Sequence, residues 1–246
     1  MKKLQRNNVY NRGFTVFGHR GVPSLFPENT IPSFQKAVDL KYDGIELDVM
    51  LTKDDVLIVH HDKEVRVKSN LEKIIDLGYE DVSAHLSKRP PKLEDVLSCL
   101  GHKTNINIEI KDQGLKANHI SEKIIKELKK FNLIDNIVIS SFSPHIIIDV
   151  KKKDDRFSTG WIWGNKNLRF FNCWGIVLKH IKPQAVHVNY SLINDRLIKK
   201  IKSYNIKILA YTVNEEKDLL DMMTKKIDGI FTDCPAILKL ARKQGL

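Results

Sequence analysis

The stretch Gly44-Ile45-Glu46-Leu47-Asp48-Val49 combines an apolar strand pattern with two acidic residues. Because side chains alternate along a strand, Glu46 and Asp48 point to one face while the apolar residues around them pack on the other. Two negative charges held side by side next to buried surface are unfavourable unless a positive charge lies near them. The stretch therefore predicts a buried strand that carries a cation-binding site.

A second apolar run, Val56–Asp62, follows almost at once and contains two adjacent histidines near its end. The connection over residues 52–55 is shorter than the dozen or so residues that a parallel crossover needs, so the second run should return antiparallel to the first. If Asp54 and Asp55 form a two-residue hairpin loop, the pairing places Asp48 opposite His61. The acidic pair and a titratable imidazole would then share one site.

Short apolar runs alternate with amphipathic helical patterns along the whole chain of 246 residues. This alternation is typical of a parallel α/β fold, and barrels of roughly 250 residues are commonly a single domain. Nine runs are predicted as strands: Thr15–Gly18, Gly44–Thr52, Val56–His60, Asn105–Ile110, Ile137–Ser141, Ser158–Trp163, Ala185–Asn189, Lys207–Thr212 and Gly229–Thr232. Since the second of the two hairpin strands is a return strand, eight parallel strands remain. We expect one TIM-type (β/α)8 barrel over residues 1–246, with an extra hairpin strand.

Helices are predicted where apolar residues recur with a 3.6-residue period. They are Ile31–Lys41, His119–Phe131, His145–Lys152, Asp195–Tyr204, Glu215–Lys225 and Pro235–Lys243. The charged segment over residues 62–90 is long for a plain loop, so we expect a small excursion after the second strand, with one helical pattern near 71–77. Pro90 and Pro91 then fix the entry to a further helix.

The net charge is +11, from 41 Lys and Arg against 30 Asp and Glu, and the lysines are dispersed over helical stretches. This pattern predicts a solvated surface, with no nucleic acid partner. The three cysteines, Cys99, Cys173 and Cys234, are isolated, which argues against a disulfide framework or a zinc site and fits a reducing cytoplasm. The first residues are charged without an apolar segment behind them, so we expect no signal peptide, and no run of 18 apolar residues occurs in the sequence. We therefore expect a cytoplasmic monomer or homodimer without stable membrane insertion.

Barrel enzymes build their sites at the C-terminal ends of the strands. Polar residues occupy these ends in this chain: His19, Arg20, Glu46, Asp48, His61, Glu109, Lys111, Tyr211, Thr212, Asn214, Thr232 and Asp233. The carboxylates of Glu46, Asp48 and Glu109 suit a hard divalent cation, Mg²⁺ or Ca²⁺, which prefers oxygen ligands. Arg20 and Lys111 add the positive charge that is needed to hold a phosphate.

Plainer interpretations of these residues exist. Glu46 and Asp48 could form a solvated face of an edge strand, but both faces of a parallel sheet are covered, which makes unpaired carboxylates costly there. Glu109 and Lys111 could be an ion pair that neutralises itself. His60 should face away from the site and suits a structural role.

Other residues carry weaker signals. The aromatic-rich stretch over residues 161–174 could line a pocket for a lipid-like alcohol, although core packing or a cap on the barrel is favoured. The histidines at positions 85, 102, 119, 145, 180 and 187 have no matching set of partners.

A set of motifs runs through nearly the whole chain in a fixed order. They are His19-Arg20-Gly21, Pro27-Glu28-Asn29-Thr30, Glu46-Leu47-Asp48-Val49, Thr52-Lys53-Asp54, His61-Asp62, Glu109-Ile110-Lys111, Ser141-Phe142-Ser143, Tyr211-Thr212-Val213-Asn214 and Asp228–Pro235. In these motifs and in their order the chain resembles the glycerophosphodiester phosphodiesterase family. A single motif of this kind would be a weak signal, whereas the ordered set is specific.

The resemblance implies a TIM-type barrel that cleaves glycerophosphodiesters into glycerol 3-phosphate and an alcohol. Carried over by position, it makes Glu46, Asp48 and Glu109 the metal ligands, His19 and His61 the catalytic pair, and Arg20 and Lys111 the phosphate-binding residues. The remaining positions would line or brace the site: Glu28, Asn29, Tyr211, Asn214 and Asp233.

Two imidazoles suit acid and base catalysis, because histidine titrates near pH 6.5 and can take and return a proton at neutral pH. We expect His19 to act as the base and His61 as the acid, with water or the glycerol 2-hydroxyl as the nucleophile. The chain departs from the family at Tyr211, where a Trp is usual, and in residues 63–70, so its leaving group is an open question.

Two alternative functions remain. A lysophospholipase D-like or sphingomyelinase D-like activity would use a similar metal and histidine arrangement on lipid substrates. A non-catalytic phosphate-binding or polyanion-binding protein is supported only by the net charge of +11.

Overall fold

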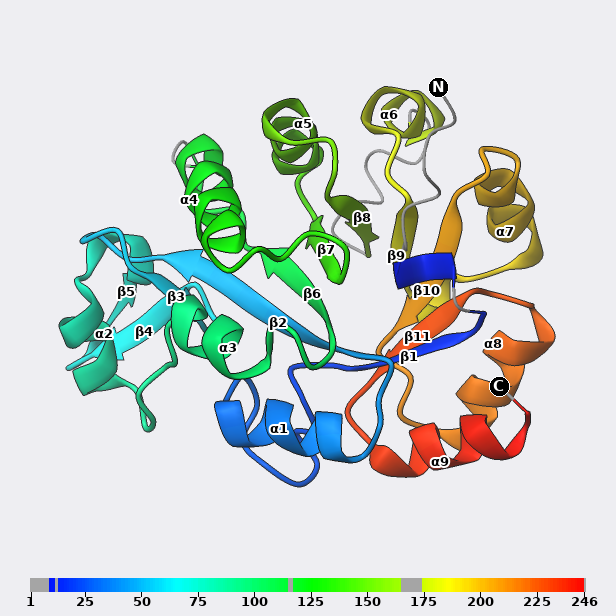
Figure 1. Cartoon of the computed structure of the whole chain (residues 1–246), viewed down its shortest axis with the longest axis horizontal. Coiled ribbons are helices and arrows are strands. Elements are labelled where there is room, and N and C mark those ends of the chain that lie inside the picture. The colour runs from blue at the N-terminus through cyan, green and yellow to red at the C-terminus, as the bar shows by residue number, and fades with distance from the viewer. Residues whose placement is uncertain (1–8, 12, 115–116, 165–173, 246) are drawn as a thin grey trace.

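The computed structural model describes residues 9–11, 13–114, 117–164 and 174–245. Within them, eight parallel strands form a closed barrel that helices surround (Figure 1). Strand β1 pairs with both β2 and β11, and this closes the ring. The barrel strands are β1 (Thr15–Gly18), β2 (Gly44–Leu51), β6 (Asn105–Ile110), β7 (Ile137–Ser141), β8 (Ser158–Trp163), β9 (Ala185–Asn189), β10 (Lys207–Tyr211) and β11 (Gly229–Thr232). The predicted TIM-type barrel is confirmed.

Helices connect the strands and cover the outside of the barrel. They are α1 (Ile31–Asp39), α3 (Leu93–Leu100), α4 (Ala117–Lys130), α5 (Pro144–Lys153), α6 (Trp174–Ile181), α7 (Asp195–Lys202), α8 (Glu216–Thr224) and α9 (Pro235–Lys243). Helix α6 was not predicted, because its start is a nearly continuous apolar run without a helical period. None of the described helices is long and apolar enough to cross a membrane. Residues 165–173 of the aromatic-rich stretch, with Cys173, lie outside the described residues.

The return strand β3 (Leu57–Val59) pairs antiparallel with β2, as predicted. The predicted register is wrong by one residue: the His60 amide donates to the Asp48 carbonyl at 3.0 Å, so His60 rather than His61 stands opposite Asp48. The loop holds three residues instead of two, because Asp55 adopts a left-handed φ of 65° before the pairing resumes. His61 lies just beyond the paired segment.

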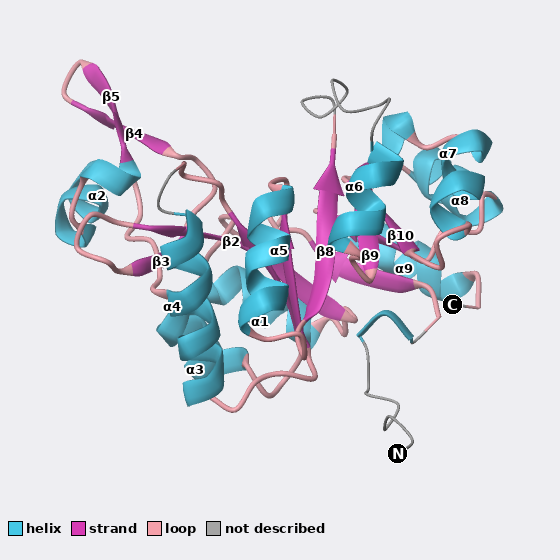
Figure 2. Cartoon of the chain, turned by 90° about the horizontal axis from the view of Figure 1, so that it is seen from above, coloured by secondary structure: helices cyan, strands magenta, loops and turns pink. Residues whose placement is uncertain are grey.

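The excursion after β3 consists of a two-stranded hairpin, β4 (Glu64–Val67) and β5 (Asn70–Lys73), a short 3₁₀ turn (Ile74–Asp76) and helix α2 (Tyr79–His85). The hairpin projects away from the barrel (Figure 2). The helical pattern predicted near 71–77 is wrong. Its apolar residue Ile74 packs instead in a small separate core with Met50 and Ile58, and this tertiary contact outweighs the local pattern.

The barrel interior has its own apolar cluster, separate from the core between strands and helices. It consists of Val9, Tyr10, Phe17, Val138, Ala185, Leu209 and Phe231. Tyr10 comes from the 3₁₀ helix Val9–Asn11, which precedes β1, and its hydroxyl lies 2.9 Å from Nε2 of the buried His187. This 3₁₀ helix thus fills the end of the barrel where the strands begin.

The buried His187 should make the stability of the fold depend on pH. Burial lowers the pKa of this histidine to about 3. Since the folded-state pKa lies below the unfolded value of about 6.5, the unfolded chain binds more protons, and the folded state loses stability as the pH falls from 6.5 towards 3. We expect a loss of ~2 kcal/mol between pH 7 and pH 5 from this group. Denaturant unfolding at both pH values should show that the His187→Gln variant lacks this part of the slope. Equal slopes for the two proteins would refute the prediction.

Candidate active site

The sequence-predicted site residues gather at the C-terminal ends of the barrel strands. A cavity of about 160 Å³ opens there, and its lining includes His19, Arg20, Glu46, His61, Glu109, Lys111 and Tyr211. Every inward-facing position follows the two-residue alternation of its strand, while the residues between them pack towards the helices. The alternation in β2 thus places the acidic pair inside the barrel.

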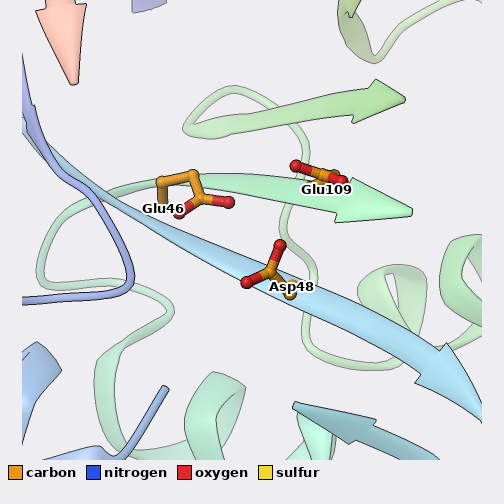
Figure 3. Close-up of side chains that lie close together, drawn as sticks. All are labelled: Glu46, Asp48 and Glu109. Carbon is orange, nitrogen blue, oxygen red and sulfur yellow. The ribbon is translucent and has the colours of Figure 1, made fainter. Parts of the chain in front are cut away.

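The three predicted metal ligands form one buried cluster. Glu46 and Asp48 come from β2 and Glu109 from β6, and Asp48 and Glu109 are register partners. Each offers an oxygen that lies within 4.8 Å of the oxygens of the other two. Figure 3 shows the three carboxylates side by side on the two neighbouring strands. Glu46, Asp48 and Glu109 are 4%, 1% and 8% exposed, so water screens their charges poorly.

Two cationic side chains neutralise part of this charge. Nζ of Lys111 lies 2.6 Å from Oδ1 of Asp48 and 2.6 Å from Oε1 of Glu109. Nε of Arg20 lies 3.3 Å from Oδ2 of Asp48, and its Nη1 contacts both oxygens of Glu28 at 3.0 Å. Both cations border the cavity, where they can also reach a phosphate.

The loop between β1 and α1 braces the acidic pair. Asn29 donates from Nδ2 to Oδ2 of Asp48 at 2.8 Å, and its Oδ1 accepts from the Asp48 amide at 3.3 Å. The Arg20 amide donates to Oε2 of Glu46 at 2.9 Å. Arg20 and Asn29 both have left-handed φ values, 52° and 55°, which turn the loop back over the strand end. Glu28 is more exposed than Asn29, and its carboxylate forms an ion pair with the Arg20 guanidinium.

His19 belongs to a hydrogen-bonded chain. Its Nδ1 lies 2.8 Å from Oδ1 of Asp233, whose Oδ2 accepts from Nδ2 of Asn214 at 2.6 Å. The Asn214 side chain is in turn fixed by the Asp233 amide, which donates to its Oδ1 at 2.9 Å. With Nδ1 held by a carboxylate, Nε2 is the nitrogen that can exchange a proton with a substrate.

His61, which also lines the cavity, has the same arrangement. Its Nδ1 lies 2.8 Å from Oδ1 of Asp62. The sequence had not assigned Asp62 a role, although it follows His61 directly. The side chain of His61 is 36% exposed, so this imidazole borders the mouth, whereas His19 is more enclosed.

The two imidazoles have opposite pKa shifts. Burial lowers the pKa of His19, but the hydrogen bond to Asp233 and the charge of Glu46 outweigh burial, and the net shift is upward. Burial lowers the pKa of His61, the charge of Lys111 lowers it further, and the net shift is downward. These directions favour His61 as the base and His19 as the acid, the reverse of the sequence-based preference. A divalent cation at Glu46 would oppose the upward shift in the pKa of His19.

The acidic cluster is electrostatically unbalanced. Burial and the charge of Asp48 raise the pKa of Glu46 to about 8. Burial acts to raise the pKa of Asp48 as well. The positive charges of Lys111 and Arg20 outweigh burial, and the net pKa of Asp48 is lowered. Burial raises the pKa of Glu109, and Lys111 offsets the shift only in part. Another positive charge near Glu46 would therefore be stabilising.

The residues present fit a divalent metal ion. The donor set is three carboxylates, which is the chemistry that Mg²⁺ and Ca²⁺ prefer. Oxygens on opposite sides of one Ca²⁺ lie about 4.6–5.2 Å apart, since each bond measures about 2.3–2.6 Å, and the observed oxygens fall within this reach. We find no histidine or cysteine in the metal-competent cluster of the described residues, which disfavours zinc.

The structure also reveals site residues that sequence reasoning missed. Asn107, Phe142, Ile162, His187 and Phe231 line the same cavity. The alternation of side chains along a strand could have predicted two of them. Asn107 lies two residues before Glu109, and Phe231 lies two residues before Asp233. His187 gave no local signal, because its partner Tyr10 is distant in sequence.

Tyr211 forms one wall of the cavity. Its hydroxyl donates to the Trp163 carbonyl at 3.3 Å, and its ring packs edge-on against Phe142. Burial raises its pKa, so the phenol stays neutral.

Comparison with known proteins shows the family of this chain. The family model described as "Glycerophosphoryl diester phosphodiesterase family" matches residues 19–237. A glycerophosphodiester phosphodiesterase of Caldanaerobacter subterraneus is 34% identical over 243 residues, which cover 94% of this chain and 98% of that protein.

Solved structures agree in fold. The glycerophosphodiester phosphodiesterase of Thermotoga maritima superimposes with a TM-score of 0.77 at 25% identity, covering 92% of this chain and 98% of that one. An Oleispira antarctica phosphodiesterase, solved with the product sn-glycerol-3-phosphate, gives a TM-score of 0.83 at 21% identity and covers 96% of this chain and 99% of its own. The chain belongs to the glycerophosphoryl diester phosphodiesterase family, and it is a hydrolase of phosphoric diesters.

Proposed function

We propose that this enzyme hydrolyses glycerophosphodiesters to glycerol 3-phosphate and an alcohol, with a divalent metal ion and two histidines. One observation supports this proposal most strongly. A buried three-carboxylate cluster, two carboxylate-bound imidazoles and two cationic side chains surround a single cavity. The product that the Oleispira antarctica relative binds is the one expected here.

In the proposed mechanism, the phosphate of the diester lies between Arg20 and Lys111. Their positive charges orient it and stabilise the charge that develops on its oxygens. Glu46, Asp48 and Glu109 would hold Mg²⁺ or Ca²⁺, which when bound supplies further charge stabilisation to a phosphate oxygen.

His19 and His61 move the protons. One imidazole removes a proton from the attacking hydroxyl, either water or the glycerol 2-hydroxyl, and the other gives a proton to the leaving alcohol. Asp233 and Asp62 fix the tautomer of the two rings by holding their Nδ1 atoms. Following the pKa directions, we assign the base to His61 and the acid to His19.

The binding of the metal ion should release a proton. Because the pKa of Glu46 is raised to about 8, this carboxyl carries a proton in much of the population at pH 7, and the cation must displace it. We expect the affinity for Ca²⁺ or Mg²⁺ to rise roughly tenfold per pH unit below pH 8. Calorimetry in two buffers of different ionisation enthalpy measures the released proton. The Glu46→Gln variant should bind more weakly and release none; an unchanged proton count in this variant would contradict the prediction.

A panel of substrates tests the proposed activity. Glycerophosphocholine, glycerophosphoethanolamine and a lysophosphatidylcholine should be assayed side by side. Turnover of the two glycerophosphodiesters with little turnover of the lysophospholipid supports the proposal. Preference for the lysophospholipid would favour the lysophospholipase D-like alternative instead.

A further inference from the structure

A groove lies between helices α6 and α7 on the outside of the barrel, where these two helices are neighbours (Figure 1). Its volume is about 820 Å³, which falls within the roughly 300–1,000 Å³ of small-molecule sites. Among the described residues, no residue lines both this groove and the catalytic cavity. The groove is therefore a separate feature of the molecule.

The groove has an apolar surface. Ile176 on α6 is 72% exposed, more than any other large apolar side chain in the described part of the chain. Leu192, from the 3₁₀ turn Tyr190–Leu192, and Leu197 on α7 also line the groove. Covering such exposed aliphatic surface is favourable, and apolar surface of this kind often marks a binding site.

A glycine keeps the groove open. A Cβ atom at Gly175 on α6 would lie 3.1 Å from the hydroxyl of Tyr204, which follows α7 in the chain. This distance is shorter than an ordinary van der Waals contact, so a side chain at position 175 would fill the space between the two helices. The absence of a side chain there leaves that space to a ligand.

Four cationic side chains border the same groove: Lys179 from α6, and Arg196, Lys199 and Lys200 from α7. Lys199 and Lys200 follow Arg196 by three and four positions, about one helical turn, so their charges lie near the charge of Arg196. The described lining contains no carboxylate. None of the four cations forms an ion pair with another described residue. The groove is therefore positively charged and favours an anionic ligand.

The shape of the groove suits a small amphiphile better than a protein or a membrane surface. Eleven described residues line it, whereas a standard protein interface takes roughly 20–30 residues on each side. Leu197 is only 6% exposed, so a flat bilayer would not reach it. One apolar chain with a charged head can contact the aliphatic side chains and the cations together.

We propose that the groove between α6 and α7 binds a single-chain amphiphile with a phosphate monoester head. The apolar chain lies against the three aliphatic side chains, and the phosphate lies among the four cations. A phosphate monoester carries a charge of about −1.5 to −2 at pH 7 and has three acceptor oxygens, so it pairs with more than one cation. The site lies outside the barrel and uses neither the carboxylate cluster nor the two catalytic histidines.

Monododecyl phosphate, kept below its critical micelle concentration, is the probe for this site. Isothermal titration calorimetry measures its binding to the full chain, with glycerol 3-phosphate added in excess to compete for the catalytic cavity. Inorganic phosphate has the head without the chain, and dodecanol has the chain without the charge. We expect each of them to bind at least roughly tenfold more weakly than the probe. Dodecanoate, with a single charge, should have an intermediate affinity.

Two double variants test the role of the charges. Arg196→Gln/Lys200→Gln removes two charges from the groove, and the affinity for monododecyl phosphate should fall roughly tenfold. Lys152→Gln/Lys217→Gln removes two charges from exposed positions on α5 and α8, outside the described lining, and should bind the probe almost as the unmodified protein does. The net charge changes equally in both, so the comparison removes its general effect.

A second pair of variants tests the role of the apolar surface. Ile176→Gln should weaken the binding of monododecyl phosphate and leave that of inorganic phosphate unchanged. Leu220→Gln replaces another exposed apolar side chain, on α8 and outside the described lining, and should change neither affinity. Thermal unfolding checks that all the variants are folded.

Several outcomes would overturn the proposal. These are equal losses of affinity in the two double variants, or a probe that binds no more tightly than inorganic phosphate. Binding to phosphatidylglycerol vesicles without binding of the monomeric probe would assign the groove to a membrane surface instead. Tighter binding of an acidic amphipathic peptide of leucine and glutamate would assign it to a protein partner. None of these measurements uses turnover, so the result does not depend on the proposed function.

Discussion

The His19→Ala and His61→Ala variants are each expected to lose roughly 10²–10⁴-fold in turnover of glycerophosphocholine, because each removes one of the two groups that move protons. Both imidazoles line the cavity, and a carboxylate holds the Nδ1 of each ring. Steady-state kinetics measures the loss. Circular dichroism and thermal unfolding should show that both variants remain folded.

A neighbouring histidine provides the matched control. His60 precedes His61 but is absent from the described lining of the cavity, so His60→Gln should keep turnover close to that of the unmodified enzyme. Near-normal turnover in both alanine variants would end the two-histidine assignment.

The leaving group separates the acid from the base. A glycerophosphodiester of p-nitrophenol needs no proton on departure, because p-nitrophenolate is a stable anion. The variant that lacks the acid should recover on this substrate, whereas the variant that lacks the base should not. We expect His19→Ala to recover, and recovery of His61→Ala instead would reverse the roles.

Removal of the metal ion is expected to have the second large effect. Dialysis against a chelator should abolish turnover, and addition of Mg²⁺ or Ca²⁺ should restore it. Glu109→Gln keeps the shape of the side chain but removes a charged ligand. Its turnover should fall by at least roughly 10²-fold at low cation concentration, with partial recovery when the cation is in excess.

A residue outside the cluster controls for loss of charge alone. Asp55 is an exposed acidic residue in the β2–β3 loop, and Asp55→Asn should leave the cation requirement unchanged. Full turnover of the chelated enzyme, with its metal content shown to be negligible, would contradict the metal-dependent account.

Much of the barrel could be predicted because its signals are local. Alternation within single strands, as at Glu46 and Asp48, fixes which side chains face inward, and the spacing of strands and helices fixes the parallel order. The same local rule, with the family resemblance, singled out residues on or next to β1, β2, β6 and β10 that now border one cavity.

The features that could not be predicted depend on an unusual backbone conformation or on contacts between distant residues. The β2–β3 register is set by the left-handed conformation of Asp55, which the assumed two-residue loop did not anticipate. The strand β5 lies where a helix was expected, because the neighbouring Ile74 packs against β2 and β3. His187 acquires its place from Tyr10, 177 positions away in the sequence.

A divalent metal ion is expected to bind the carboxylate cluster, and a crystal soaked in Mn²⁺ would reveal the position of this ion through its anomalous signal. We expect one strong peak with oxygens of Glu46, Asp48 and Glu109 within bonding distance, and we expect the ammonium of Lys111 to move away from the oxygens of Asp48 and Glu109 that it now contacts. A cluster that stays free of Mn²⁺ at saturating concentration, or a peak bound by other residues, would contradict it.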